Sequence, residues 1–185
     1  MATVAEKLIT AEEFIRMPDP PDGSQQELVR GVIVTMPPPG FRHGRRQVRA
    51  ATLLDNFACS TRLGRVTVES GVITERDPDT VRGPDVAYWS AERLPLDIEP
   101  EGYPDVAADL CVEVLSPHKR LRKILEKLRE YFERGVRMVW IIDPEDRTVT
   151  VYRSPDEGRV LHEGATLSGD EVLPGFSCRV AELFE

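Results

Sequence analysis

The spacing of hydrophobic residues predicts both helices and strands in the N-terminal third of the chain. Thr10 followed by Glu13 has the pattern of a capping box, so a short helix is expected there. The segment 27–36 predicts one or two strands, with Gly31 as a turn or bulge. From about residue 44 to 61, apolar side chains recur at helical spacing, which predicts an amphipathic helix. Its expected apolar stripe is Val48, Ala51, Leu54 and Phe57.

The rest of the chain has the pattern of strands around one long helix. The expected strands lie in residues 66–75, 84–89, 110–115, 136–143 and 148–153. The helix is expected over about 117–134, with Ser116 as its N-cap, and Gly135 suits its C-terminal cap. The last two strands are expected to form a hairpin through PEDR, and residues 169–184 predict a short strand and a terminal helical turn.

This order of elements predicts an α/β fold with a mixed central sheet and helices packed on its faces. Strands outnumber helices, and helix–strand crossovers occur beside hairpins. The composition, 41% hydrophobic and 30% charged, is that of an ordinary globular protein. Because the sequence contains no internal repeat and no linker, a single domain over residues 1–185 is expected.

Several classes of protein are disfavoured by the composition. No apolar stretch approaches the roughly 18 residues of a membrane span, so no membrane partner is expected. The N-terminus lacks the apolar run and cleavage site of a signal peptide. Cys59, Cys111 and Cys178 are far apart in apolar settings, which indicates reduced core cysteines of a cytoplasmic protein rather than a disulfide framework or a zinc site.

The charge pattern alone does not identify a partner. The formal net charge of −8 is a poor background for loose binding of nucleic acid. Two local basic clusters nevertheless exist. The first is Arg42, His43, Arg45, Arg46 and Arg49, and the second is His118, Lys119, Arg120, Arg122 and Lys123. A negative body with positive patches suits a protein that meets nucleic acid at one site, but it suits an ordinary acidic protein better.

Two carboxylates interrupt strands that are otherwise apolar. Asp85 follows Pro84, which suits the start of a strand, and Glu113 lies inside the apolar run 110–115. A buried carboxylate needs a charged partner or a metal, because removing the ion from water costs roughly several kcal/mol. Asp85 is either a turn residue or a metal ligand. Glu113 either lies on an edge strand, pairs with an arginine, or joins Asp85 in holding one Mg²⁺, which prefers oxygen ligands.

A lysine that could complete such a site is found on the following helix. Position 115 is Leu115, where a lysine would be expected close behind a metal-binding Glu113. At 100° per residue, Lys127 lies at the edge of the apolar stripe of this helix, beside Ile124 and Tyr131. Its stem can therefore pack on the sheet while its ammonium reaches the strand ends. The alternative is a solvated lysine on a basic helix face.

These residues occur in an order that resembles a known family. P-D, E-V-L-S-P, a lysine eleven residues after that serine, Y-x-x-x-G-V and W-I-I-D-P follow one another along the chain. This combination resembles the Uma-type family of bacterial putative restriction endonucleases, which belongs to the PD-(D/E)xK nuclease superfamily. The segment ELVRGVIVTMPPPGFRHG resembles the N-terminal hairpin and the His-containing helix start of that family, and TVTVYR and residues 169–184 resemble its C-terminal portion.

The resemblance implies a restriction-endonuclease-like fold with an N-terminal hairpin and a site for Mg²⁺, with Mn²⁺ as a substitute. Asp85, Glu113 and the carbonyl group of Val114 would hold the metal, and Lys127 would be the catalytic lysine. Glu27 and His43 match positions that recur near the site of the family. His43 would orient a water or a phosphate, and Glu27 would hold a basic group or a second metal through water.

The implied activity is hydrolysis of DNA phosphodiester bonds, with RNA as an alternative substrate. A homodimer is compatible with the resemblance. Arg45, Arg46 and Arg49 are candidate contacts to the nucleic-acid backbone. The chain departs from the family after S-P, where His118, Lys119 and Lys123 replace the hydroxyl and acidic residues that members commonly carry. An inactive nuclease fold that binds nucleic acid, or a protein-interaction module, therefore stays open as the alternative function.

Overall fold

The computed structural model describes residues 7–116 and 121–185. In chain order its elements are α1 (Ala11–Phe14), β1 (Gln25–Val29), β2 (Val32–Met36), α2 (Phe41–Thr61), β3 (Gly64–Val68), β4 (Val72–Glu75), β5 (Thr80–Arg82), β6 (Val86–Ser90), β7 (Leu110–Val114), α3 (Leu121–Arg134), β8 (Met138–Asp143), β9 (Thr148–Ser154), β10 (Glu157–His162), β11 (Thr166–Ser168), β12 (Ser177–Arg179) and the 3₁₀ helix η1 (Val180–Phe184).

A six-stranded mixed sheet forms the centre of the fold. Its strand order is β10-β9-β8-β7-β6-β3. β7 and β8 run parallel, and the other neighbours in this sheet are antiparallel. α3 connects the parallel pair, as parallel neighbours require a crossover between them. The predicted mixed central sheet is therefore confirmed.

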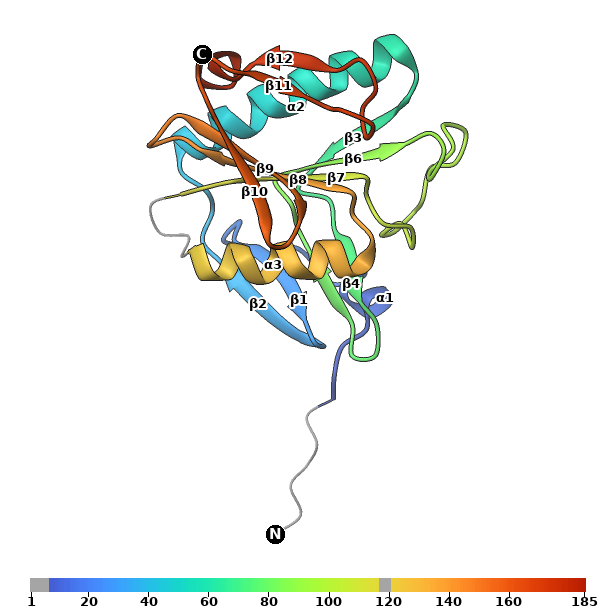
Figure 1. Cartoon of the computed structure of the whole chain (residues 1–185). Coiled ribbons are helices and arrows are strands. Elements are labelled where there is room, and N and C mark those ends of the chain that lie inside the picture. Colours follow the sequence, from blue (N-terminus) through green and yellow to red (C-terminus); the bar gives the residue numbers. More distant parts are fainter. Residues whose placement is uncertain (1–6, 117–120) are drawn as a thin grey trace.

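The two long helices cover opposite faces of this sheet (Figure 1). α2 packs through Leu54 into a core that includes Val112 and Trp140. α3 packs through Leu128 into a second core that includes Cys111 and Ile141. Because successive strand residues point to opposite faces, neighbouring residues of β7 and of β8 divide between the two cores.

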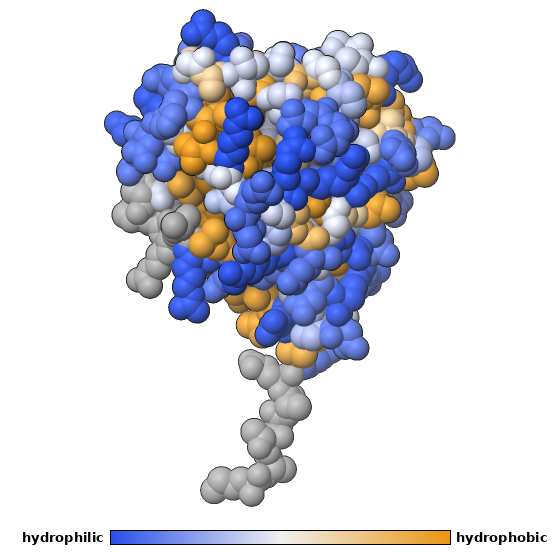
Figure 2. Space-filling view, viewed as in Figure 1, coloured by the Kyte–Doolittle hydropathy of each residue, from blue (hydrophilic) through white to orange (hydrophobic). Residues whose placement is uncertain are grey.

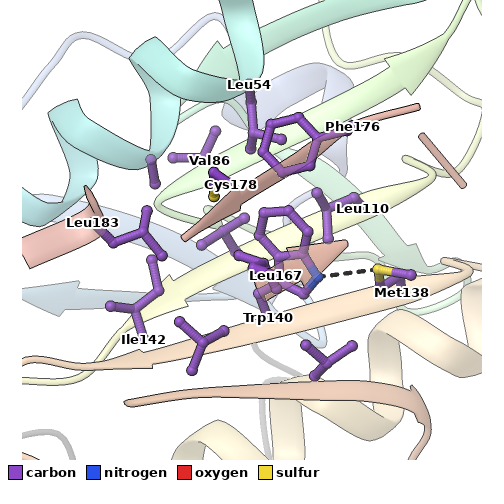
Figure 3. Close-up of a cluster of buried hydrophobic side chains, with 14 of the residues drawn as sticks. Leu54, Val86, Leu110, Met138, Trp140, Ile142, Leu167, Phe176, Cys178 and Leu183 are labelled. Atoms are coloured by element: carbon purple, nitrogen blue, oxygen red, sulfur yellow. Dashed lines mark hydrogen bonds between the residues drawn. The ribbon is translucent and has the colours of Figure 1, made fainter. Parts of the chain in front are cut away.

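The core beneath α2 is closed by the C-terminal segment. Figure 3 shows Trp140 among Leu167, Phe176 and Cys178, with its indole Nε1–H directed at the sulfur of Met138 at 3.0 Å. Phe176 also lies against the Trp140 ring, with the ring centroids 5.7 Å apart. The apolar tail residues thus form part of the main core.

A second sheet of four strands, in the order β2-β1-β5-β4, lies on the α3 side of the molecule (Figure 1). β1 and β2 form the predicted N-terminal hairpin, whose turn has positive φ angles at Arg30 (50°) and Gly31 (76°). β1 also pairs with β5 through Leu28 and Val81. This pairing brings the hairpin next to the chain segment that leads into β6.

Most predicted elements occur in the structure. The capping box of Thr10 and Glu13 is present, and Gly135 follows α3 with a φ of 101°. The hairpin of β8 and β9 and the predicted terminal strand and turn are also present. The predicted helix start at Ser116 and residue 117 involves positions outside the described residues.

Two sequence-based expectations need correction, and some short or exposed strands were missed. Val48 was expected in the apolar stripe of α2 but is 56% exposed, because that helix buries the polar side chains of His43 and Gln47 instead. Cys59 was expected in the core, yet it is exposed, and its thiol donates a hydrogen bond to the carboxylate of Asp55. The three-residue strands β5 and β11 and the largely exposed strand β10 were not predicted.

Within the described residues, no helix combines the length and the apolar character needed to cross a membrane.

Candidate active site

The two anomalous carboxylates lie side by side at one end of the central sheet. Asp85 directly precedes β6, and Glu113 is in β7. These strands are antiparallel with Val86 opposite Val112, so the register places Asp85 and Glu113 at the same end of the pair. Both are buried, 4% and 1% exposed. Because β7 lies between β6 and β8, the edge-strand alternative for Glu113 is wrong.

Asp85 is held in place by a backbone group and by α2. Its Oδ2 accepts a hydrogen bond from the backbone N–H of Val114 at 2.5 Å, and its Oδ1 lies 2.9 Å from Nε2 of His43. Gln47, one turn after His43, donates to the backbone carbonyl of Asp85 at 3.1 Å and to Glu69 at 3.1 Å. The same helix face therefore fixes both the main chain and the side chain of Asp85.

Two side chains of α3 donate hydrogen bonds to Glu113. Its Oε1 accepts hydrogen bonds from the ammonium of Lys127 at 3.2 Å and from the hydroxyl of Tyr131 at 2.8 Å. Lys127 and Tyr131 are four residues apart, so both project from one helix face toward the sheet. Glu113 therefore has the lysine partner that was expected from the helix.

Lys127 occupies the position expected for a lysine supplied by the helix. It is 8% exposed, and besides Glu113 its Nζ contacts Oε1 of Glu27 at 2.6 Å. Burial acts to lower the pKa of Lys127, but Glu113 and Glu27 together outweigh it and raise that pKa above its ordinary value. The side chain is therefore a protonated ammonium held between two carboxylates.

Glu27 reaches this cluster from β1 and holds basic groups, as one of the two expectations for it stated. Besides Lys127, it accepts hydrogen bonds from Arg82 at 3.0 Å and from the backbone N–H of Gly83 at 3.1 Å. Burial acts to raise the pKa of Glu27, whereas these cations and the N–H lower it, with a net lowering. The guanidinium of Arg82 in turn donates two hydrogen bonds to the carboxylate of Glu130 in α3, at 2.6 and 2.7 Å.

The cluster also affects two uncharged neighbours. Tyr131 is fully buried, and burial together with the nearby Glu113 raises its phenolic pKa well above the ordinary value. Burial and Glu113 raise the pKa of the Cys111 thiol in the same way. Both groups are therefore neutral around Glu113, and Tyr131 serves as a hydrogen-bond donor.

His43 lies near the site, as expected, and its imidazole ring contacts the carboxylate of Asp85. The ring is 5% exposed, and its Nδ1 has no hydrogen-bond partner among the described residues. Its expected role toward a water or a phosphate stays a prediction.

The three candidate arginines of α2 contact the C-terminal 3₁₀ helix η1 or Glu185, the residue that follows it. Arg46 donates to the carbonyl groups of Leu183 and Glu185, and Arg45 donates to that of Glu185. Arg49 donates to the carbonyl group of Glu182 at 3.0 Å. These contacts stabilise the packing of η1 on α2, and contacts of the same arginines with nucleic acid stay a prediction.

Sequence reasoning missed Gln47, Arg82 and Tyr131. A signal existed for Arg82, which stands in a short buried strand two residues before the P-D motif. Tyr131 lies one helical turn after Lys127, on the face already assigned to the sheet. Gln47 follows His43 by one turn in the same manner. Gln47 and Tyr131 could therefore have been found by extending the predicted site along the helix faces of His43 and Lys127.

The carboxylates of the cluster supply oxygen atoms, the type of ligand that Mg²⁺ prefers. The cluster holds four carboxylates, from Glu27, Asp85, Glu113 and Glu130, against two cations, Lys127 and Arg82, which leaves negative charge in excess among the described residues. No group of three or more His, Cys, Asp or Glu within residues 7–116 and 121–185 is arranged to hold a metal. Mg²⁺ does not require one, since it commonly binds through one or two carboxylates and keeps several waters.

Comparisons of the chain with protein families and with solved structures are consistent with a nuclease. A family model described as Uma2, putative restriction endonuclease, matches residues 11–181. The chain belongs to the Uma2 family. No curated protein sequence matches the chain significantly.

A solved structure supports the same assignment for this Uma2 protein. The chain is similar to the crystal structure of a putative nuclease belonging to DUF820 from Anabaena variabilis ATCC 29413, at 25% sequence identity and a TM-score of 0.78. The match covers 95% of this chain and 97% of the other. The Uma2 chain therefore has a nuclease fold over almost its whole length, and both comparisons support a nuclease.

Proposed function

We propose that this Uma2 protein is a Mg²⁺-dependent endonuclease that hydrolyses phosphodiester bonds of DNA, with Mn²⁺ as a substitute metal. The observation that carries the proposal is the placement of Lys127 Nζ 3.2 Å from Glu113, with Asp85 at the same end of the adjacent strand. Two carboxylates for a metal and one ammonium for a phosphate are thereby brought together from separate elements. The membership in a nuclease family agrees with this chemistry.

Asp85, Glu113 and the carbonyl group of Val114 would hold the metal. When bound, such an ion activates a water and neutralises charge that develops on the phosphate. His43 and the N–H of Val114 fix the orientation of the Asp85 carboxylate. Tyr131 and Lys127 restrict Glu113 in the same way.

Lys127 acts as a positive charge rather than as a base in this proposal. Its two carboxylate neighbours favour the protonated form, so its Nζ can donate hydrogen bonds to a phosphate oxygen. A preorganised donor of this kind stabilises charge that develops in the transition state. Glu27 and Arg82 determine where the ammonium stands before substrate arrives.

Cleavage of a supercoiled plasmid tests the proposed function. We expect the wild-type protein to nick or linearise the plasmid with Mg²⁺ or Mn²⁺, and to leave it intact when EDTA removes the metal. Equal cleavage in EDTA would contradict the metal dependence. An intact plasmid with both metals, together with binding of the same DNA, would favour the inactive nucleic-acid-binding module. Cleavage of an RNA strand alone would move the substrate from DNA to RNA.

A further inference from the structure

The outward face of α2 carries an exposed aromatic side chain beside two arginines. Phe41, the first residue of this helix, is 85% exposed, more than any other large hydrophobic side chain in the described part of the chain. At 100° per residue, Phe41, Arg42 and Arg45 lie away from the side of α2 that buries His43 and Gln47. Both arginines are exposed. These three residues, the basic knob, therefore point away from the sheet.

Positive charge accumulates around the basic knob. Burial together with the neighbouring arginines, which include Arg147, Arg45 and Arg42, lowers the pKa of Arg46. The cations therefore repel one another, and an acidic surface that approaches them would relieve this repulsion. Aromatic and arginine side chains are also the types that most often dominate the binding energy of protein interfaces. Both properties favour contact with an acidic surface that has room for an aromatic ring.

A groove of about 580 Å³ lies next to the amino-terminal end of α2. Met36 lines it five residues before Phe41 in the chain. Glu69, also in its lining, accepts a hydrogen bond from Gln47 of α2 at 3.1 Å. The groove is thus on the side of α2 that faces the sheet, whereas Phe41 is on another side. The basic knob is therefore directed away from the groove of its own chain.

The apolar part of this groove suits an aromatic ring. Its lining includes Phe14, Met17, Met36 and Tyr103, and Met17 is 40% exposed. Methionine adapts to the shape of its neighbours and makes favourable contacts between its sulfur and an aromatic ring. The volume of the groove is within the range of about 300–1,000 Å³ that is typical of ligand pockets. A phenyl ring with an adjacent arginine can therefore be accommodated.

The charge of the groove is opposite to that of the basic knob. Its lining includes Asp19, Glu27, Glu69 and Glu101, and among the described residues it contains no Lys, Arg or His. Glu27 is held by Lys127, so the excess negative charge comes from the other three carboxylates, which are all exposed. One chain thus presents an acidic groove and a basic knob that are complementary to each other.

Other surfaces compete less well for a partner. Figure 2 shows mostly hydrophilic residues on the face that carries α3, with separate small hydrophobic areas. The strands β3 and β10 end the six-stranded sheet, and an edge strand can pair with another chain. Val68 of β3 is 52% exposed and Val160 of β10 is 53% exposed. These edges lack an opposite charge to meet, and they provide matched positions for controls.

We propose that the protein forms a two-fold dimer in which the basic knob of each copy inserts into the acidic groove of the other. Phe41 occupies the apolar part of the groove, and Arg42 and Arg45 face its exposed carboxylates. Both surfaces adjoin the amino-terminal end of α2, so two copies can exchange them reciprocally, and two-fold dimers are the commonest closed assembly. This inference goes beyond the proposed function and does not depend on it.

The molar mass in solution tests the dimer in the absence of metal and nucleic acid. Light scattering and sedimentation equilibrium should give the wild type twice the chain mass of 20.8 kDa. Phe41→Ala should raise the dissociation constant of the dimer at least about 30-fold, the effect of truncating a dominant interface residue. Because Phe41 is exposed in the single chain, the variant should fold normally. The matched control, Val68→Ala, should change the constant less than about twofold.

Reversal of charge identifies the surface that receives the basic knob. Arg42→Glu and Glu101→Arg should each raise the dissociation constant about tenfold, because like charges then meet across the interface. The two substitutions combined on one chain should restore most of the affinity, since opposite charges again face each other. A double variant that is weaker than either single variant would contradict the contact between knob and groove.

The outcomes separate this inference from the proposed function. A monomeric wild type, or a Phe41→Ala dimer of wild-type strength, overturns the dimer even if the protein cleaves DNA. Loss of the dimer in Val68→Ala alone would place the interface on the edge of β3 and overturn the role of the knob. A mass that keeps rising with concentration would mean an open chain of copies and overturn the two-fold closure. A knob-dependent dimer without cleavage supports the inference while the nuclease proposal fails.

Discussion

Lys127→Met is expected to reduce plasmid cleavage at least about 100-fold, the usual effect of removing one preorganised donor to transition-state charge. The variant keeps a side chain of similar length but removes the ammonium between Glu27 and Glu113. Because those carboxylates are then buried without it, the free energy of unfolding should fall by about 3 kcal/mol. Initial cleavage rates and urea unfolding measure the two effects.

Arg129→Met is the matched control for this substitution. It removes one positive charge from an exposed position of the same helix and should alter the free energy of unfolding by less than about 0.5 kcal/mol. A Lys127→Met protein that is folded by circular dichroism and cleaves at the wild-type rate would show that the ammonium has no part in the chemistry.

Asp85→Asn is expected to abolish cleavage, with a loss of at least about 1,000-fold, because it removes one of the two carboxylate ligands proposed for the metal. The amide is almost isosteric and its oxygen can still accept the hydrogen bond from the N–H of Val114. Stability without metal should therefore change by no more than about 1 kcal/mol. Cleavage rates and thermal unfolding in EDTA measure these effects.

The control for Asp85→Asn is Asp97→Asn, which makes the same chemical change at an exposed position. This control should cleave like the wild type and unfold at the same temperature. Wild-type cleavage by Asp85→Asn would remove this carboxylate from the site. A large loss of stability in EDTA would instead mean that Asp85 is mainly a structural residue.

The sequence was sufficient for much of the fold because the large elements have strong periodicity. The hairpin, the helix before Gly135 and the strand around Glu113 all carry clear patterns and occur as predicted. β5 was missed because it has only three residues. β10 was missed because it lies at the edge of the sheet and most of its side chains are exposed, which leaves no regular alternation of apolar and polar positions.

The site could be predicted only in part from the sequence, because several of its contacts join residues that are far apart in the chain. The sequence indicates that Glu113 needs a partner and that Lys127 can reach the sheet, and the structure places them in contact. It does not indicate that Glu27, distant in the chain, would take the shorter contact with that lysine, or that Arg82 would hold Glu27. Those contacts depend on how the hairpin packs against β5, which no local pattern specifies.

Burial of a carboxylate alone does not identify a functional site in this protein. Asp109 immediately precedes β7 and is 0% exposed, yet it binds Arg93 at 3.2 Å, Arg137 at 3.5 Å and the backbone N–H of Ser90 at 2.8 Å. These partners satisfy it within the fold. Asp85 and Glu113 differ because they adjoin each other and share their surroundings with a buried lysine.

The central claim is that Asp85 and Glu113 hold a divalent metal, and calorimetric titration with Mn²⁺ tests it most directly. We expect one saturable binding event for the wild type and its loss in Glu113→Gln, which keeps the shape of the side chain and removes its charge. The exposed control Glu99→Gln should bind like the wild type. Equal Mn²⁺ binding by wild type and Glu113→Gln, or no binding by the wild type, would contradict the metal site.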